Sequence, residues 1–353
     1  MRKFLSLFFA TLMVIFFCSC NGGSSNDTVP VSSNVSTASE ASSNETSGRT
    51  SVYRCSLGTA SIGGNFNVSG TALANVLNKY MDKFEMTVEV TGGSSDNAVK
   101  IHNGEIEFGF IGENINYVGH RGEGWANGTK YENSRVIMAQ NPGAVQILCD
   151  KKQTDVNNIT DLTGKVISNG TTTGGGVLAA NEIYPILGVE YKTRQDMGWS
   201  DAMTAMGDGL IDVCMDLGGF PAAAFAEFAS THDSKWVPIT KEQADSVSAV
   251  YPYYTAGTIP AGTYDDMDED YNTIFTWYEC ITSVDTDPDL VYEMLETIYA
   301  HKDELTLGAA SYEWLDVSNV THLATPLHVG AIRFYEDQGI KLPESAYGPE
   351  WQG

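Results

Sequence analysis

One Gly-rich segment occurs twice in this chain. GTASIGG at residues 58–64 returns as GTTTGGG at residues 170–176, each after a short apolar run and before a helical stretch. A second pair of similar segments lies downstream. Residues 95–108 and 200–213 both contain Ser-Asp, then Gly, then Ile followed by an acidic residue, and the corresponding positions are separated by a constant offset. Each half thus reads strand, Gly/Thr/Ser loop, helix, strand, helix, Gly turn, strand, which is typical of an α/β lobe with a parallel sheet.

Two similar lobes predict a cleft between them, since ligands of such sheets bind beyond the carboxyl ends of the strands. We expect an α/β fold of two lobes, each a small sheet flanked by helices. The long apolar run 135–148 is the expected crossover into lobe 2, and 251–260 is the expected return. These crossovers assign 52–141 and 256–353 to lobe 1 and 142–255 to lobe 2, and together they form a hinge.

The N-terminus has the pattern of an export signal. Arg2-Lys3 precedes the apolar run 4–17, which is too short for a comfortable membrane span, and Cys18-Ser19-Cys20 follows. This resembles a bacterial lipobox, which predicts a signal peptide at 1–19 and lipidation of Cys20. The alternative is an ordinary secreted protein cut near the same place. Residues 20–51 are rich in Ser, Thr and Asn and contain no aromatic residue, so we expect a tether.

The charge of the chain excludes several partners. Its formal net charge is −25, and removal of Arg2 and Lys3 would make it more negative. Such a field disfavours nucleic acid and anionic lipid surfaces. An anionic ligand would therefore have to be held by local dipoles, and the Gly-rich loops are the natural candidates.

The cysteines of the body allow two interpretations. Cys55, Cys149, Cys214 and Cys280 are an even number in an exported protein, which permits disulfides in three connectivities. All lie in apolar, strand-like runs, which favours buried free thiols. The chain contains no Cys-x-x-Cys, so zinc and redox roles are disfavoured.

Five blocks of the chain resemble, in collinear order, the TAXI family of solute-binding subunits of TRAP (tripartite ATP-independent periplasmic) transporters. The blocks are 58–74, 91–108, 218–221, 251–264 and 326–331. The resemblance implies a type II periplasmic binding fold that closes on a small organic acid or amino acid, similar to glutamate or 2-oxoglutarate. It also implies delivery to an ion-gradient-driven TRAP permease by an extracytoplasmic, lipid-anchored monomer without a cofactor, metal or catalytic activity.

The resemblance and the neighbouring loop residues give a set of expected ligand contacts. They are Ser61, Gly63, Gly64, Phe66, Asn67, Thr91, Ser94, Asn97, Glu113, Asn114, Tyr117, Thr172, Thr173, Gly174, Gly175, Gly176, Gly219, Phe220 and Pro221. The chain departs from the family where Phe66-Asn67 stands in place of a usual Tyr. It departs again where 112–114 reads Gly-Glu-Asn instead of Gln-Ser-Asp, and where 173–176 lacks two hydroxyls.

The physical basis of these contacts is the helix N-terminus. A carboxylate near Gly63-Gly64 and 174–176 would meet free backbone N–H groups, and glycine permits the close approach. Glu113 would favour a ligand that also carries an amine if it faces the cleft, and would have no such effect if it faces solvent or caps a helix.

Other functions have weaker support in the sequence. The acidic run 265–270 lacks the spacing of a calcium loop, and His322 and His328 do not share a helix face, so structural roles are favoured. No Gly-x-Ser-x-Gly, His-Glu-x-x-His or Gly-x-x-x-x-Gly-Lys motif occurs, which argues against an enzyme. A ligand-sensing surface lipoprotein remains the main alternative. The sequence leaves open the ligand and whether the envelope has one membrane or two.

Overall fold

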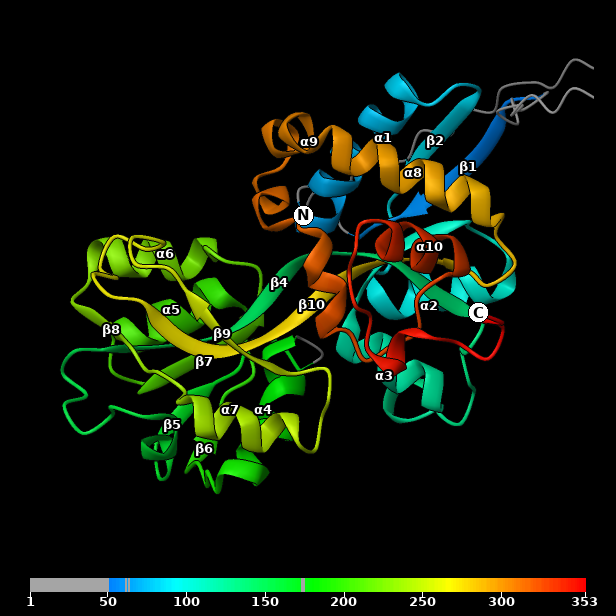
Figure 1. Cartoon of the computed structure of the whole chain (residues 1–353). Helices are drawn as coiled ribbons and strands as arrows, with labels where there is room; N and C mark the ends of the chain where they lie inside the picture. The colour runs from blue at the N-terminus through cyan, green and yellow to red at the C-terminus, as the bar shows by residue number, and fades with distance from the viewer. Residues whose placement is uncertain (1–50, 61, 63, 173–174) are drawn as a thin grey trace, which may run out of the picture. The chain divides into compact units, whose positions relative to one another are not determined.

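The computed structural model describes residues 51–60, 62, 64–172 and 175–353, so the expected signal peptide, tether and Cys20 lie outside the described residues. The elements belong to one compact unit, Arg49–Gly353 (Figure 1). The strands are β1 (Tyr53–Gly58), β2 (Phe84–Glu89), β3 (Phe108–Gly112), β4 (Ser134–Asp150), β5 (Val166–Ser168), β6 (Thr193–Arg194), β7 (Val213–Gly218), β8 (Ser234–Trp236), β9 (Thr255–Ile259) and β10 (Tyr271–Ser283). The α-helices are α1 (Asn65–Tyr80), α2 (Ser94–Asn103), α3 (Glu113–Arg121), α4 (Gly175–Leu187), α5 (Trp199–Gly207), α6 (Ala223–Thr231), α7 (Lys241–Ser248), α8 (Pro288–Ala300), α9 (Lys302–Gly308) and α10 (Val329–Asp337).

The described strands form one sheet with the order β2-β1-β3-β10-β4-β7-β5-β6. β8 pairs with β4, and β9 pairs with β10. β1, β2 and β3 are parallel, and so are β5, β6 and β7. The two halves of the sequence repeat therefore become two parallel groups of strands, which confirms the expected two-lobed α/β fold.

Two long strands, β4 and β10, belong to both lobes, and we call them the hinge strands. β4 has 17 residues and β10 has 13. They pair antiparallel from Ser134–Ser283 to Ala144–Phe275. On its other edge, β10 pairs with β3 in lobe 1. β4 continues past the ladder and pairs with β7 in lobe 2. Figure 1 shows both strands running from one lobe to the other.

The hinge differs from the sequence expectation on one side. The run 135–148 lies inside β4, as expected for the first crossover. The expected return at 251–260 instead contains β9, which pairs with the first residues of β10. Ile259 and Tyr271 pack in one core with α5 and α6, so the return to lobe 1 is β10 itself. β10 is buried on both faces and shows no clear alternation, so nothing in its sequence marked it as the crossover.

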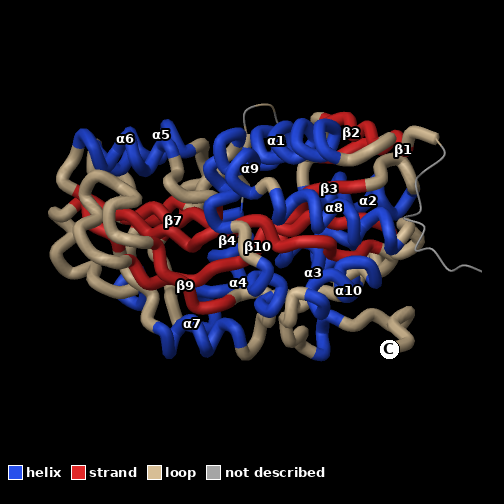
Figure 2. The backbone as a smooth tube through the Cα atoms, turned by 45° about the horizontal axis from the view of Figure 1, so that its top comes forward, coloured by secondary structure: helices blue, strands red, loops and turns tan. Residues whose placement is uncertain are grey.

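In lobe 2, helices cover both faces of the sheet. One core joins β7 residues Val213 and Met215 with α4 and α7, and the other joins Cys214 with α5 and α6. Successive strand residues point to opposite faces, so β7 supplies both cores. Figure 2 shows α5 and α6 on one side of the strands and α7 and α4 on the other.

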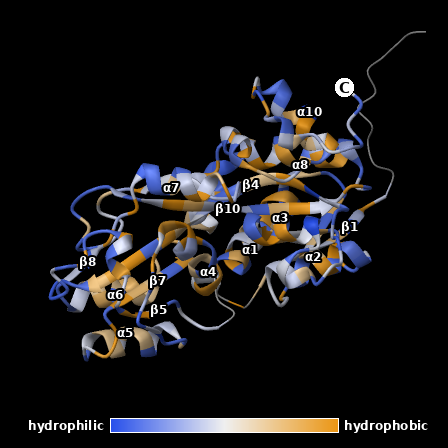
Figure 3. Cartoon of the chain, turned by 90° about the horizontal axis from the view of Figure 1, so that it is seen from below, coloured by the Kyte–Doolittle hydropathy of each residue, from blue (hydrophilic) through white to orange (hydrophobic). Residues whose placement is uncertain are grey.

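In lobe 1, α1 packs against β2, α8 and α9, while α2 and α3 pack against β3 and β10. Its core is a single cluster that includes Leu57, Leu73, Phe108 and Ile281. β7 is largely hydrophobic along its length (Figure 3). Among the described helices, none has the length and apolar character needed to span a membrane.

The body cysteines Cys55, Cys149, Cys214 and Cys280 are free and buried. Burial raises the pKa of Cys149 to about 11, and it raises the pKa of Cys214 and Cys280 as well. The structure therefore agrees with the interpretation of these residues as buried free thiols.

Asn97 ties together the ends of β1 and β3. Its amide nitrogen donates to the carbonyl oxygens of Gly58 (3.2 Å), Thr59 (2.8 Å) and Phe110 (2.8 Å). A Cβ atom on Gly58 would lie 2.6 Å from the Asn97 side-chain oxygen, so glycine is needed for this approach. One buried amide thus fixes the strand ends that precede α1 and α3.

We predict that Asn97→Asp destabilises the protein by about 3 kcal/mol, because a carboxylate oxygen would face three carbonyl oxygens that lose their donor. Urea unfolding at neutral pH measures this change in the free energy of unfolding. The matched control is Asn103→Asp, at an exposed position of the same helix. If both variants unfold at the same urea concentration, the hydrogen bonds of Asn97 do not contribute to stability as predicted.

Candidate ligand-binding site

A cavity of about 670 Å³ lies where the two lobes meet the hinge strands, and we call it the main cavity. Lobe 1 contributes Ala60, Asn65, Phe66, Gly92, Ser94, Ser95, Gly112, Asn114, Ile115 and Trp125. Lobe 2 contributes Thr172, Gly175, Leu178 and Leu217, and β10 contributes Thr276 and Tyr278.

The helices α1 to α4 begin at this cavity. The residues before α1, α2 and α3 are Gly64, Gly93 and Gly112, and none of the three helices has a side-chain cap. α4 begins with Gly175, which lines the cavity itself. The first N–H groups of a helix have no partner within the helix, and its N-terminus carries partial positive charge. The cavity is therefore suited to an anion.

β10 adds two hydroxyl groups to the cavity wall. The Thr276 side chain is only 1% exposed, and its Oγ1 has no hydrogen-bond partner. The Tyr278 ring packs edge-on against Phe66, with 5.0 Å between the ring centroids. Burial raises the pKa of Tyr278, and Asp216 raises it further, so the phenol stays protonated and can donate a hydrogen bond.

The structure brings several of the expected contact residues together. Those lining the main cavity are Phe66, Ser94, Asn114, Thr172 and Gly175. Those lining a second cavity, described below, are Gly219, Phe220 and Pro221. Ser61, Gly63, Thr173 and Gly174 lie outside the part of the chain that the structure describes.

Other expected contacts support the loops and line neither cavity. Asn97 is fully buried, and the Thr91 hydroxyl donates to the carbonyl oxygen of Thr59 (2.9 Å) and to the Asn97 side-chain oxygen (2.6 Å). The Asn67 amide donates to the Thr59 hydroxyl at 3.4 Å, and Gly64 is the N-cap of α1. These residues set the shape of the β1–α1 loop.

The glycines at the start of α4 have a packing role. A Cβ atom on Gly175 would lie 2.5 Å from the carbonyl oxygen of Leu217, and one on Gly176 would lie 2.6 Å from that of Asn169. Glycine therefore lets α4 begin directly against β7. Tyr117 packs on Tyr253, with ring centroids 5.3 Å apart, and is likewise absent from both linings.

Sequence reasoning missed the contributions of Thr276, Tyr278, Trp125 and Leu178. Thr276 and Tyr278 were missed because the return crossover was expected elsewhere, so β10 was not recognised as a cavity wall. A sequence signal existed in the long run of β-branched and aromatic residues at 271–283, which favours a strand. Trp125 and Leu178 show no comparable signal in the sequence.

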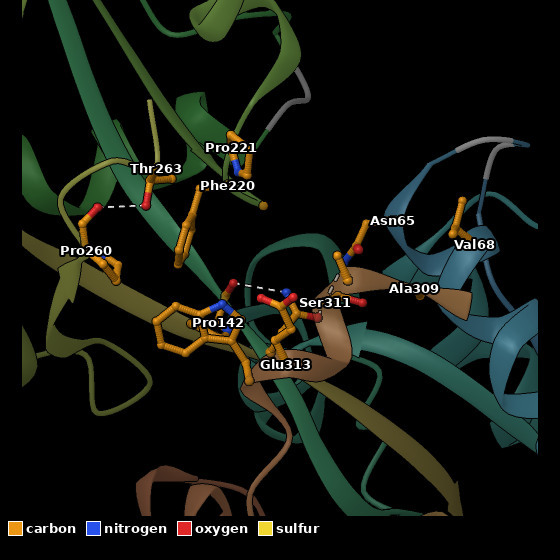
Figure 4. Close-up of a pocket in the computed structure, with 14 residues that line it drawn as sticks. Asn65, Val68, Pro142, Phe220, Pro221, Pro260, Thr263, Ala309, Ser311 and Glu313 are labelled. Atoms are coloured by element: carbon orange, nitrogen blue, oxygen red, sulfur yellow. Dashed lines mark hydrogen bonds between the residues drawn. The ribbon is translucent and has the colours of Figure 1, made fainter. Parts of the chain in front are cut away.

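A second cavity of about 810 Å³ adjoins the main one, and we call it the aromatic cavity (Figure 4). Asn65 lines both cavities. On the side of lobe 2 it is lined by Gly219, Phe220, Pro221, Pro260 and Thr263, and on the other side by Val68, Ala309, Ala310, Ser311, Glu313 and Trp314, with Asn141 and Pro142 from β4. Phe220 and Trp314 meet edge to face, with ring centroids 5.4 Å apart.

The described residues contain no group of three or more His, Cys, Asp or Glu that could hold a metal ion. His328 is the N-cap of α10, where its Nδ1 accepts from the Gly330 N–H at 3.1 Å. In the acidic run, Asp266 accepts hydrogen bonds from Ser234 and Trp236. These groups have structural partners.

Comparison with known proteins places this architecture. The model of the NMT1-like family matches residues 57–339. The chain belongs to the NMT1-like family. A TctC solute binding protein from Polaromonas is similar to it, with a TM-score of 0.52 and 16% identity over 74% of this chain and 86% of that one. The probable amino-acid ABC transporter extracellular-binding protein ytmK from Bacillus subtilis matches with a TM-score of 0.45 and 14% identity over 75% and 98%.

At 16% identity the first of these matches shows a shared fold, that of a periplasmic binding protein.

The NMT1-like chain buries a pair of carboxylates beside the main cavity. Glu113 is fully buried, lines neither cavity, and accepts from the Ala324 N–H at 2.6 Å, while its Oε2 has no partner. Glu279 of β10 accepts from Asn116 (2.7 Å) and Thr325 (2.8 Å). Burial raises the pKa of Glu113 well above its usual range, and Glu279 raises it further. Burial also raises the pKa of Glu279 to about 7.

We predict that Glu113→Gln raises the free energy of unfolding relative to wild type at pH 8. This gain should exceed the effect of the same substitution at pH 5 by about 1–3 kcal/mol. A raised pKa means that the folded state binds more protons than the unfolded state above the unfolded pKa. The stability of the wild type is then lost as the pH rises from about 4.5 through 7. The amide removes one of the two acids and keeps an acceptor for the Ala324 N–H.

Urea unfolding of both proteins at pH 5 and pH 8 measures the effect. Glu344→Gln, at an exposed position, is the matched control and should change stability equally at both pH values. The prediction is wrong if Glu113→Gln and wild type show the same pH dependence.

Proposed function

We propose that this chain is an extracytoplasmic solute-binding lipoprotein of the TAXI type. It captures a small organic acid or amino acid in the main cavity and delivers it to the membrane subunits of a TRAP permease. Cys20 is the proposed lipidation site, with residues 20–51 as a tether and no catalytic role for the body. The shared fold with a protein named as a solute binding protein supports a binding role.

The convergence of α1, α2, α3 and α4 on one cavity is the observation that carries this proposal. Three of these helices have glycine at the N-cap and no side-chain cap. The N–H groups of Gly93 and Gly112 donate to Thr91 (3.2 Å) and Ser94 (3.1 Å), so the donors left for a ligand are the N–H groups of the first helical turns. The unpartnered Thr276 hydroxyl adds a donor from the hinge. Both lobes and the hinge strand would thus hold the same ligand group.

These donors explain how an acidic protein can bind an anion. The formal net charge is −25, and no lining residue of the main cavity in the described chain is a Lys, Arg or His. Hydrogen bonds to a charged group contribute about 1.5–3 kcal/mol each. A few of them approach the roughly 8 kcal/mol that corresponds to micromolar affinity, once ordering costs are met.

The surroundings of Glu113 bear on the choice between acid and amino acid. If the Glu113 carboxylate faced the cavity, it would favour a ligand that carries an amine. The carboxylate is instead buried against Ala324 and lines neither cavity. We therefore favour an organic acid over an amino acid.

We predict that a small carboxylic acid raises the melting temperature of the full-length chain. A ligand at about 100 times its Kd adds about 2.7 kcal/mol of stability. The screen uses the sodium salts of pyruvate, phenylpyruvate, 2-oxoglutarate, succinate, glutamate and glutamine. The proposed function fails if none of these shifts the melting temperature.

We further predict that Thr276→Val weakens binding of the acid found in that screen about tenfold without lowering stability, because its hydroxyl has no partner to lose. Calorimetry gives the affinity. Thr282→Val is the matched control on the same strand, since the Thr282 hydroxyl donates to the Glu107 carbonyl oxygen at 2.7 Å. The control should lose stability and keep its affinity. The site is wrong if Thr276→Val keeps its affinity while Thr282→Val loses it.

A further inference from the structure

The main cavity and the aromatic cavity adjoin at the first turn of α1. Asn65 lines both of them, Phe66 lines the main cavity, and Val68 lines the aromatic cavity. Asn65 therefore stands at the boundary between the two cavities, where its amide donates to the Asn141 side-chain oxygen at 3.5 Å. A ligand whose carboxylate lies at the helix N-termini would reach the second cavity by passing Asn65. Figure 4 shows Asn65 and Val68 on α1 across the aromatic cavity from Phe220 and Pro221.

The charges of the lining restrict what such a ligand carries besides its carboxylate. No described residue that lines the main cavity is charged, and Glu313 is the only charged residue in the lining of the aromatic cavity. Among the described lining residues, a second carboxylate would find no cationic side chain, and desolvating an unpaired charge is costly.

The aromatic cavity offers apolar surface instead. Phe220 and Trp314 meet edge to face, and Phe220 stacks on Phe275 with 5.6 Å between the ring centroids. Phe220 and Trp314 are only partly buried, so part of each side chain remains free to contact a ligand. The rest of the apolar lining is Val68, Pro142, Pro221, Pro260, Ala309 and Ala310. Such walls match an apolar group of aromatic size.

We infer that the ligand is a monocarboxylate with an apolar tail of aromatic size. Its carboxylate is held by the N-termini of α1 to α4 and by Thr276, and its tail lies past Asn65 against Phe220 and Trp314. This inference rests on the proposed function and names the substrate class of the same site.

Calorimetry with the full-length chain and four probes tests the inference. Phenylpyruvate has the tail, pyruvate lacks it, 2-oxoglutarate has a second carboxylate in its place, and phenylalanine adds an amine. We expect phenylpyruvate to bind at least tenfold more tightly than each of the other three. If 2-oxoglutarate, phenylalanine or pyruvate binds as tightly or more tightly, the inference is wrong and the proposed function stands. If no acid binds, both are wrong.

Two variants locate the tail. Trp314→Leu should weaken phenylpyruvate binding about tenfold and leave pyruvate binding unchanged. Trp351→Leu is the control, because Trp351 packs against the core of lobe 1 and lines neither cavity.

Val68→Asn tests the same placement at a position where a folding defect is not expected, because the Val68 side chain on α1 is 42% exposed. It should selectively weaken phenylpyruvate binding as well, whereas Leu307→Asn, at a 90% exposed position, should change nothing. Equal losses for pyruvate and phenylpyruvate in Trp314→Leu and Val68→Asn would overturn the placement of the tail.

Discussion

The antiparallel ladder between β4 and β10 is the constraint on which the rest of the structure depends. Its pairs Pro142–Trp277 and Gly143–Thr276 lie near one end of the ladder, between the lobe 1 partners and the lobe 2 partners of the same two strands. Any rotation of one lobe relative to the other must therefore pass through these few residues. Thr276 and Tyr278 lie at this point and also line the main cavity, so the hinge and the site share residues.

The site is built mainly from backbone. Gly64, Gly93 and Gly112 precede three helices that start at the cavity, and a glycine cannot cap those helices with a side chain. Natural helices usually begin with Ser, Thr, Asp or Asn, whose side chains occupy the first N–H groups. With glycine in their place at three neighbouring helices, the N–H groups of the first turns have no capping side chain, and Asn97 holds the loops that present them.

The sequence predicted the parts of the fold that depend on local pattern. The repeated Gly-rich loop indicated two lobes with parallel strands, because each copy follows a short apolar, strand-like run. Of the residues expected to contact the ligand, Phe66, Ser94 and Thr172 line the main cavity. The hinge was only half predicted, because β10 is buried on both faces and lacks a period. The direction of the Glu113 side chain could not be predicted, since its partner Ala324 lies 211 residues further along the chain.

The buried cysteines have a consequence for the response of the fold to redox conditions. Each described thiol is enclosed in a core, and burial keeps Cys149, Cys214 and Cys280 protonated, so the reactive thiolate form is scarce. The described body therefore reaches its native state without forming a disulfide among these cysteines. Because the described cysteines form no disulfide, the stability of the folded body would be the same in reducing and oxidising surroundings.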